Sequence, residues 1–503
     1  MKTLFKPTSY PKGAALAVGA TLVWKVISFA NALLLALYFG ANRQTDVYFY
    51  LIMLVGFGIA FLQRLNQSIL IPEAMFLEQE NKETARRFIN MWLFIYGGLA
   101  ILISTAGWVG TAPLWKIFSR FSGPILAQDH ALLTCGFILL GLQIITYYLT
   151  AVAEMYKFFK TAWLGVLNAL CPLLCLLLFG TQVGIISMVY GFLVANLIQI
   201  VVLGILLKTQ LHWHFAPAWI PLRVQTRQNM LTGQTLAVLD MLNSWLPVYL
   251  ISGMNAGLVS ALNYAKQFTD SSTEVFTARV ANVAKIEMTE HASANRPDLA
   301  NQTFVRASFV LLVLLAPLVV FSCYFAPQIV ELFLERGQFG PQAAQNTVYF
   351  LRPMLFVLLL SVPGYLQNSV LAAERKIKEW FPYALTSGVI LTGLSCFLIP
   401  RYGGFSYPYI LAIGLLIGFI LNAFLFRKQL PQINYLQPFY QLARVVLWAA
   451  IALIPAVLFS YVLSPIDWVQ IMGCGVVFVT VYVGILYVTK DAQKLVEFVR
   501  NSF

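Results

Sequence analysis

The sequence predicts an all-α, polytopic membrane protein with about 14 transmembrane helices, arranged as two parallel six-helix lobes and two C-terminal helices. Three observations predict this class. The 503 residues are 59% hydrophobic and only 11% charged, a composition that excludes a soluble globular protein of this length. Apolar stretches of roughly 20 residues, the length that crosses a bilayer as a helix, follow one another with short connections. Lys and Arg residues concentrate on every second connection.

The apolar stretches place each expected span. They lie at residues 14–39, 47–71, 89–110, 131–153, 160–180, 184–207, 230–252, 257–284, 305–325, 347–372, 381–400, 405–426, 441–463 and 467–489. The first stretch is longer than the roughly 7–15-residue apolar core of a signal peptide, so we expect it to remain as a span. All six Cys residues lie inside apolar stretches, which predicts packing and neither disulfides nor metal ligation.

The distribution of basic residues predicts the orientation. Of the 33 Lys and Arg residues, 23 lie at the termini and on alternate connections, whereas five lie on the intervening ones. Positive charge resists translocation, so both termini are expected in the cytoplasm. The formal net charge of +13 is dispersed over these connections and is not clustered in a groove. We therefore interpret it as topology and expect no nucleic-acid partner.

Two pairs of segments indicate an internal duplication at an offset of about six spans. Residues 112–118 (APLWKIF) are similar to 326–333 (APQIVELF), and residues 83–88 (ETARRF) are similar to 298–304 (DLANQTF). Because six is even, the two halves share one orientation, a recurring design of transporters that handle substrate between the halves. A non-transporting membrane scaffold could carry the same duplication.

The duplication also predicts how the chain divides. We expect an N-terminal lobe of six spans over residues 1–215 and a C-terminal lobe of six spans over residues 216–430. Residues 431–503 hold the last two spans and the cytoplasmic tail. These two spans lie outside the duplicated unit.

Polar residues inside several spans predict a hydrated cavity. A charge at the bilayer centre costs about 2.5–3.5 kcal/mol on insertion scales, so such residues normally face partners or water. Lys25 and Asn31 lie on the first span, and Asp46 and Arg64 lie near the two ends of the second. Asp240 lies on the seventh.

The eighth span is the most polar. Lys266, Asp270 and Glu274 recur every four residues, so on a helix they form one stripe that partly neutralises itself. Lipid would not tolerate this stripe, which predicts that it faces water. For each residue alone, a structural ion pair and a substrate contact are equally good interpretations. The cluster as a whole favours a central aqueous cavity with a cationic component.

The sequence contains no phosphate-binding glycine loop, ATPase motif or nucleophile constellation, so we expect a protein that is not an enzyme and has no cofactor. Energy would come from Na+, H+ or the membrane potential. His212 and His214 have no acidic or Cys companion nearby in the sequence and predict no metal site.

Three motifs carry a family resemblance. In chain order they are residues 39–41 (FGA) leading to 45–49 (TDVYF), residues 264–265 (YA), and the segment 329–339 (IVELFLERGQF). In this order, and with the number of spans, they resemble the MurJ/MviN family of lipid flippases. That family belongs to the multidrug/oligosaccharidyl-lipid/polysaccharide exporter superfamily. The resemblance covers most of the chain.

The resemblance implies a multi-pass protein of the bacterial inner membrane, acting as a monomer. It would move an undecaprenyl-pyrophosphate-linked saccharide, similar to the peptidoglycan precursor lipid II, from the cytoplasmic to the periplasmic leaflet by alternating access. The last two spans would border a groove for the polyprenyl tail. Other partners would be membrane lipids.

The resemblance also assigns roles to the polar residues of the spans. The family carries arginines that contact the pyrophosphate, and this chain departs from that pattern with Lys and Asn. The expected substrate-binding residues are Lys25, Asn31, Arg64 and Lys266. The expected acidic residues, which position the cations or couple ions, are Asp46, Asp240, Asp270 and Glu274.

Two further transport functions stay open. An O-antigen or exopolysaccharide unit would present the same pyrophosphate to the same cations. A multidrug/cation antiporter of the superfamily would instead depend on the acidic residues and need few cations.

Overall fold

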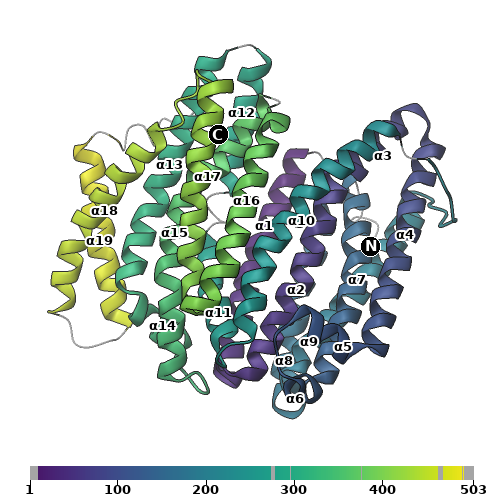
Figure 1. The fold of residues 1–503 in the computed structure, drawn as a ribbon, viewed down its shortest axis with the longest axis horizontal. Coiled ribbons are helices and arrows are strands. Elements are labelled where there is room, and N and C mark those ends of the chain that lie inside the picture. The colour runs from purple at the N-terminus through teal and green to yellow at the C-terminus, as the bar shows by residue number, and fades with distance from the viewer. Residues whose placement is uncertain are drawn as a thin grey trace. The chain divides into compact units, whose positions relative to one another are not determined.

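The computed structural model describes residues 10–221, 223–272, 278–294, 296–374, 376–462, 468–489 and 491. Every regular element in these ranges is a helix, as Figure 1 shows. Among the described residues, thirteen helices are long and apolar enough to cross a membrane. The predicted all-α, polytopic membrane class is therefore confirmed. The remaining expected span, the eighth at 257–284, corresponds to α11 (Leu258–Ser272) and the start of α12 (Ala278–Ser293), which flank residues outside the described ranges.

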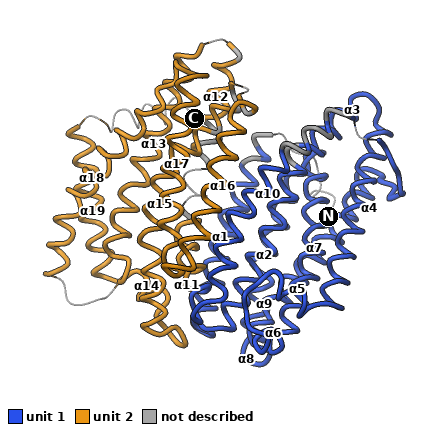
Figure 2. Tube along the Cα trace, in the orientation of Figure 1, with its two compact units in different colours: residues 1–260 blue, residues 261–503 orange. Residues whose placement is uncertain are grey.

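The chain forms two compact units, residues 1–260 and residues 261–503, coloured separately in Figure 2. The long helices of unit 1 are α1 (Tyr10–Phe39), α2 (Arg43–Leu65), α4 (Lys82–Val109), α7 (His130–Met155), α8 (Leu167–Val183), α9 (Ile186–Gln210) and α10 (Val224–Ser252). Its shorter elements are the π-helix η1 (Asn66–Leu70), α3 (Ile71–Glu80), α5 (Thr111–Phe118), α6 (Gly123–Gln128) and the 3₁₀ helix η2 (Phe159–Val166).

Helix α7 is the centre of unit 1, because α2, α4 and α9 all pack against it. Small residues allow this packing. A Cβ atom added at Gly141 of α7 would lie 2.8 Å from the carbonyl oxygen of Ala100 on α4, closer than real Cβ contacts come. The two backbones therefore approach each other directly at this point, as is common between membrane helices.

Unit 2 consists of α11 from Ala261 onward, α12, α13 (Pro297–Tyr324), α14 (Ala326–Leu334), α15 (Pro341–Ala373), α16 (Ile377–Tyr402), the 3₁₀ helix η4 (Gly404–Ser406), α17 (Tyr407–Gln429), α18 (Gln437–Ser460) and α19 (Trp468–Val488). Helix α15 packs against α12, α13 and α17. The two C-terminal spans attach to this unit, since α18 packs against α13 and α19 packs against α18.

The two units repeat the same local structure. The pairs α4–α7, α7–α9 and α8–α9 of unit 1 correspond to α13–α15, α15–α17 and α16–α17 of unit 2. The similar segments that begin at Ala112 and Ala326 form the short helices α5 and α14. The other pair opens α4 and α13, where each helix buries an Ala and a Phe: Ala85 and Phe88, Ala300 and Phe304.

The sequence similarity thus marks equivalent structural positions. The division of the chain into lobes at residues 215 and 430 stays a prediction.

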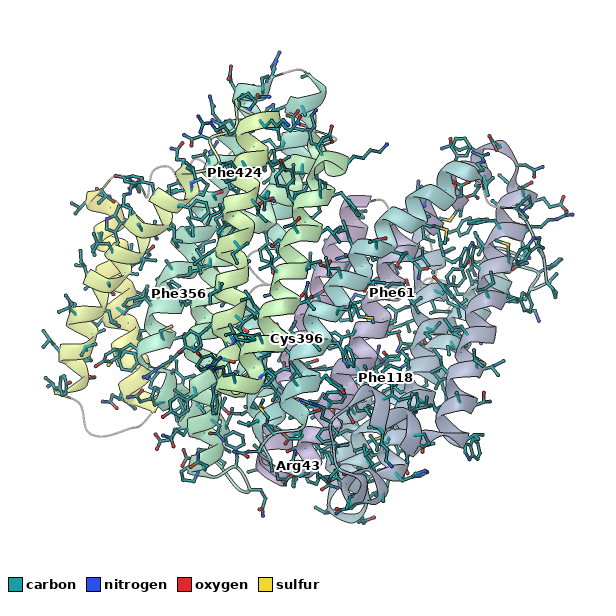
Figure 3. The ribbon with its side chains drawn as sticks, viewed as in Figure 1. Arg43, Phe61, Phe118, Phe356, Cys396 and Phe424 are labelled. Carbon is teal, nitrogen blue, oxygen red and sulfur yellow. The ribbon has the colours of Figure 1, made fainter. Side chains whose placement is uncertain are left out.

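Large apolar side chains are exposed on the outside of the helices, as expected for a multi-pass membrane protein. Phe356 on α15 and Phe424 on α17, both labelled in Figure 3, are 53% and 63% exposed. A soluble monomer rarely exposes large contiguous apolar patches, whereas a bilayer favours them.

Candidate functional site

The clearest polar feature of unit 1 is an ion pair between side chains of two membrane-spanning helices. Nη1 of Arg64, in the last turn of α2, lies 2.5 Å from Oδ2 of Asp240 on α10. Both residues belong to candidate spans, yet their side chains are 46% and 60% exposed. Lipid would not tolerate charges exposed to this degree, so this part of unit 1 faces water.

The backbone around Arg64 is irregular. Helix α2 passes directly into the π-helix η1, a form that occurs frequently at functional sites. The first residue of η1, Asn66, is buried, and its Oδ1 accepts a hydrogen bond of 2.8 Å from the hydroxyl of Tyr96 on α4. This contact holds the turn that presents Arg64.

Lys25 and Asn31 share α1 but have different surroundings. Lys25 is half-buried, with Nζ 5.0 Å from the ring centroid of Trp24, so part of its side chain remains accessible. Asn31 is buried, and its Nδ2 donates a 2.8 Å hydrogen bond to the carbonyl oxygen of Ala169 on α8. Asn31 therefore fastens α1 to α8. Its role in substrate binding stays a prediction.

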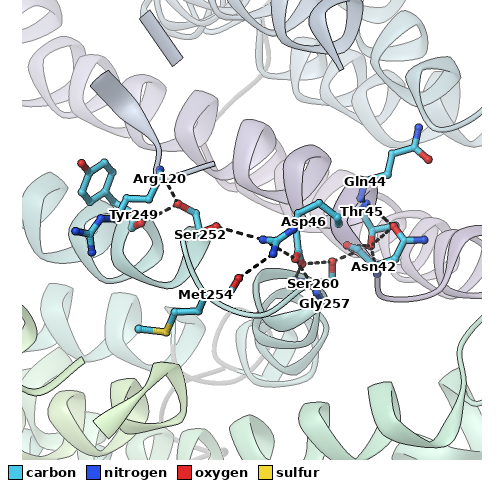
Figure 4. Close-up of polar contacts among 11 residues, drawn as sticks. Asn42, Gln44, Thr45, Asp46, Arg120, Tyr249, Ser252, Met254, Gly257 and Ser260 are labelled. Atoms are coloured by element: carbon cyan, nitrogen blue, oxygen red, sulfur yellow. Dashed lines mark hydrogen bonds and ion pairs between the residues drawn. The ribbon is translucent and has the colours of Figure 1, made fainter. Parts of the chain in front are cut away.

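Asp46 lies in a buried network that Figure 4 shows. Its Oδ2 accepts a hydrogen bond of 2.7 Å from the backbone N–H of Gly257. Its Oδ1 accepts two bonds of 2.8 Å, from the backbone N–H and the hydroxyl of Ser260. All three residues belong to unit 1, so the carboxylate joins the first turn of α2 to residues 257–260 within that unit. The structure gives Asp46 this structural contact, and its predicted part in ion coupling stays a prediction.

Two further features support this network. Arg43 donates from Nη2 to the carbonyl oxygen of Met254 at 2.9 Å, so α2 also holds the connection after α10. Gly257 has φ +85°, and an added Cβ would lie 2.7 Å from the carbonyl oxygen of Ala41. Only glycine fits both requirements. Sequence reasoning missed Arg43, although the Asn42–Thr45 capping box marked the start of α2.

Unit 2 contributes Lys266 and Asp270, one turn apart on α11. Lys266 is half-buried and Asp270 is exposed. Both act electrostatically on the hydroxyl of Tyr407, the first residue of α17, so the two charges lie near the same end of that helix. Glu274, the third residue of the predicted stripe, lies outside the described residues.

The described residues therefore place accessible charged side chains in both units. Unit 1 carries Lys25 and the Arg64–Asp240 pair, and unit 2 carries Lys266 and Asp270. Among the described residues, no group of three His, Cys, Asp or Glu side chains is arranged to hold a metal ion. These charged side chains are suited to the binding of anions and cations.

Comparison with known proteins decides the family. The model of the family described as "Lipid II flippase MurJ" matches residues 35–472, most of the chain. The chain belongs to the MurJ family. The predicted resemblance is thereby confirmed. The MurJ family consists of flippases, which are membrane transporters and not catalysts.

Relatives and solved structures agree with this assignment. The probable lipid II flippase MurJ of Borreliella burgdorferi is 22% identical over 98% of this chain and 99% of its own length. A solved structure described as lipid II flippase MurJ in an inward closed conformation matches with a TM-score of 0.80 at 16% identity, over 95% of this chain and 100% of that one.

An inward-facing multidrug resistance transporter of the MATE family matches less closely. Its TM-score is 0.62 at 11% identity, over 87% of this chain and 98% of that one. Both structural matches show the fold.

Proposed function

We propose that this protein moves an undecaprenyl-pyrophosphate-linked saccharide, of the lipid II type, from the cytoplasmic to the periplasmic leaflet of a bacterial inner membrane. The observation that carries this proposal is the exposed Arg64–Asp240 pair inside two spans of a MurJ-family chain. The lobes would alternate access to this polar surface. Both termini would be cytoplasmic, and the protein would act as a monomer.

The pyrophosphate group defines what the site must supply. It carries about two negative charges, and burying them unpaired would cost several kcal/mol. Lys25 supplies one positive charge in unit 1. The guanidinium of Arg64 can bind a phosphate oxygen pair with two parallel hydrogen bonds, which an ammonium cannot do.

Asp240 competes with the substrate for the guanidinium of Arg64. In the absence of substrate, the 2.5 Å contact holds the guanidinium in place and neutralises it. A pyrophosphate brings more charge than one carboxylate and competes for the same guanidinium. Arg64 is therefore pre-positioned but exchanges its partner when substrate arrives.

An apolar groove of unit 2 is suited to the polyprenyl tail. It lies between α13 and α19 and has a volume of about 620 Å³. Its lining includes Leu314, Leu318, Phe321, Met472, Val476 and Val479. This position beside the last span agrees with the groove expected from the family resemblance. The groove provides the apolar contact that a hydrocarbon tail requires.

The proposal includes no cofactor. Net movement would be driven by Na+, H+ or the membrane potential, with Asp240 and Asp270 as the exposed acidic residues available for coupling. The MATE-like fold makes a cation antiporter the second candidate, because such a protein would use the same acidic residues for its substrate.

One set of variants distinguishes the two functions. In proteoliposomes, Lys25→Gln and Lys266→Gln should each impair movement of a lipid-linked saccharide, while Asp270→Asn should retain measurable flipping. Lys→Arg variants at the two positions should be milder, because charge persists. An antiporter would show the opposite order, with cation efflux lost in Asp270→Asn and retained in both Lys→Gln variants. Lys116→Gln is the matched control, because Lys116 is exposed and lies outside the candidate spans, so this variant loses one charge away from the proposed site.

A further inference from the structure

Unit 2 contains a second groove, larger than the first, that the proposed function does not use. It has a volume of about 860 Å³ and lies between the C-terminal half of α17, the connection at residues 430–436 and the start of α18. Its lining separates into an apolar body and a polar rim. The body includes Leu416, Phe419, Ile420, Phe424, Leu436 and Phe439, and the rim consists of Arg427, Gln432 and Asn434.

The floor of this groove is built from packed aromatic rings. The rings of Phe426 and Tyr435 stack with centroids 4.6 Å apart, and the ring of Phe419 meets that of Phe439 edge-on at 4.8 Å. The hydroxyl of Tyr435 donates a 2.7 Å hydrogen bond to Oε1 of Gln367 on α15. These contacts fix the floor in place, so the groove is pre-formed, as ligand sites usually are.

The walls are exposed and apolar. Ile420, Phe424 and Leu436 are 59%, 63% and 66% exposed, on or beside membrane-spanning helices. Phe424 is labelled in Figure 3. In a bilayer such side chains contact hydrocarbon, so the groove opens toward lipid and not toward an aqueous cavity.

The depth of the groove corresponds to one leaflet. Leu416 and Arg427 are the first and last lining residues of α17, and their spacing on a helix corresponds to about 16 Å. The hydrocarbon core of a bilayer is about 30 Å thick, so one leaflet contributes about half of that. A single acyl chain therefore fits the groove from rim to base.

The rim carries a cation at the level of the headgroups. Arg427 is exposed in the last turn of α17, at the end that the distribution of basic residues assigns to the cytoplasm. Within the described part of the chain, no carboxylate forms an ion pair with Arg427. A guanidinium in this position offers a phosphate two parallel hydrogen bonds. Gln432 and Asn434 add exposed amides beside it.

We propose that this groove binds an anionic phospholipid of the cytoplasmic leaflet. The phosphate lies against Arg427, and one acyl chain follows Phe424 and Ile420 over the aromatic floor. The cation at the rim favours a phospholipid over the polyprenyl tail of the substrate, because a hydrocarbon tail offers no charge for Arg427 and the lining of the groove between α13 and α19 includes no charged residue. Its lining includes none of the cationic residues of the proposed transport path, Lys25, Arg64 and Lys266.

The test compares lipid binding to the purified full-length protein by native mass spectrometry. Phosphatidylglycerol and phosphatidylcholine with the same acyl chains serve as probes. Arg427→Gln should weaken phosphatidylglycerol binding about tenfold, the effect of losing one charge-assisted contact. Lys428→Gln removes the same charge one residue further on, outside the groove lining, and should change binding less than about twofold.

A second pair of variants tests the body of the groove. Ile420→Trp fills it and should reduce binding of phosphatidylglycerol, whereas Ile413→Trp, two turns away on the lipid-facing side of α17 and outside the lining, should not. Thermal unfolding of each variant checks its fold, and the Arg427 pair stands alone if Ile420→Trp does not fold.

Three results would overturn the proposal. They are equal losses in Arg427→Gln and Lys428→Gln, equal retention of phosphatidylcholine and phosphatidylglycerol by the parental protein, and displacement of phosphatidylglycerol from the groove by undecaprenyl phosphate. The first would mean diffuse surface charge, the second an unspecific apolar surface, and the third a tail site of the substrate. None of them would affect the proposed transport function, which depends on other residues.

Discussion

Removal of one charge from the Arg64–Asp240 pair should have opposite effects on substrate binding, depending on which partner is changed. Both side chains are about half exposed, so the pair itself contributes only about 0.2–1 kcal/mol. Asp240→Asn removes the competitor for the guanidinium. Binding of a polyprenyl pyrophosphate should then become tighter by a factor of roughly 1.4 to 5, the equivalent of that energy.

Arg64→Gln should have a much larger effect in the other direction. A hydrogen bond to a charged group contributes about 1.5–3 kcal/mol, so binding should weaken by a factor of roughly 10 to 150. The unfolding temperature should change little in either variant, because the exposed pair contributes little to stability. This separates an effect on the site from an effect on the fold.

The assay is equilibrium binding of a short-chain polyprenyl pyrophosphate to purified protein, with the corresponding uncharged alcohol as a control ligand. The double variant Arg64→Gln/Asp240→Asn should bind like Arg64→Gln alone, because the competitor has no effect once the guanidinium is gone. Equal losses of binding in the two single variants would refute the reasoning, since they would show that the pair only maintains the local structure.

Two predictions concern stability and are checked by thermal unfolding in detergent. Gly257→Ala should destabilise the protein by about 1–3 kcal/mol or more, because its φ is +85° and the added Cβ meets a carbonyl oxygen. Gly403→Ala is the control, with φ +82° but no atom within 4 Å, and it should be clearly milder; equal effects would mean that backbone strain alone matters. Arg444→Leu should destabilise by about 3–5 kcal/mol, because Arg444 pairs with Asp491, which is 3% exposed. Adding Asp491→Asn should recover part of this loss, because a neutral amide costs less to bury than a carboxylate, and no recovery would show that the charge of Asp491 is not its cause.

The sequence predicted the fold well because its signals are local. Apolar length, alternating basic connections and similar segments each follow from a few neighbouring residues, and the equivalent short helices at Ala112 and Ala326 appear where the similarity placed them. The polar residues of the spans could be found in the same way. Their partners could not. Asn31 contacts a carbonyl of α8, and Asp46 binds groups more than 200 residues further along the chain.

Helical periodicity explains this limit. It indicates which face of a helix is polar, but it does not say whether that face meets water, a substrate or a distant backbone N–H group. Asp46 and Asp240 look alike in the sequence, as single carboxylates on apolar spans. The structure separates them, since Asp46 is buried among hydrogen-bond donors and Asp240 is exposed beside one cation.

The central claim is that the chain moves a lipid-linked pyrophosphate across a bilayer with its intramembrane cations. The most direct measurement is flipping of a fluorescent polyprenyl-pyrophosphate saccharide in proteoliposomes, followed by chemical quenching of the label in the outer leaflet. The parental protein should make nearly all of the label accessible over time, and the double variant Lys25→Gln/Lys266→Gln, reconstituted to the same density, should leave the inner-leaflet fraction protected. Equal accessibility in the double variant and the parental protein would contradict the claim.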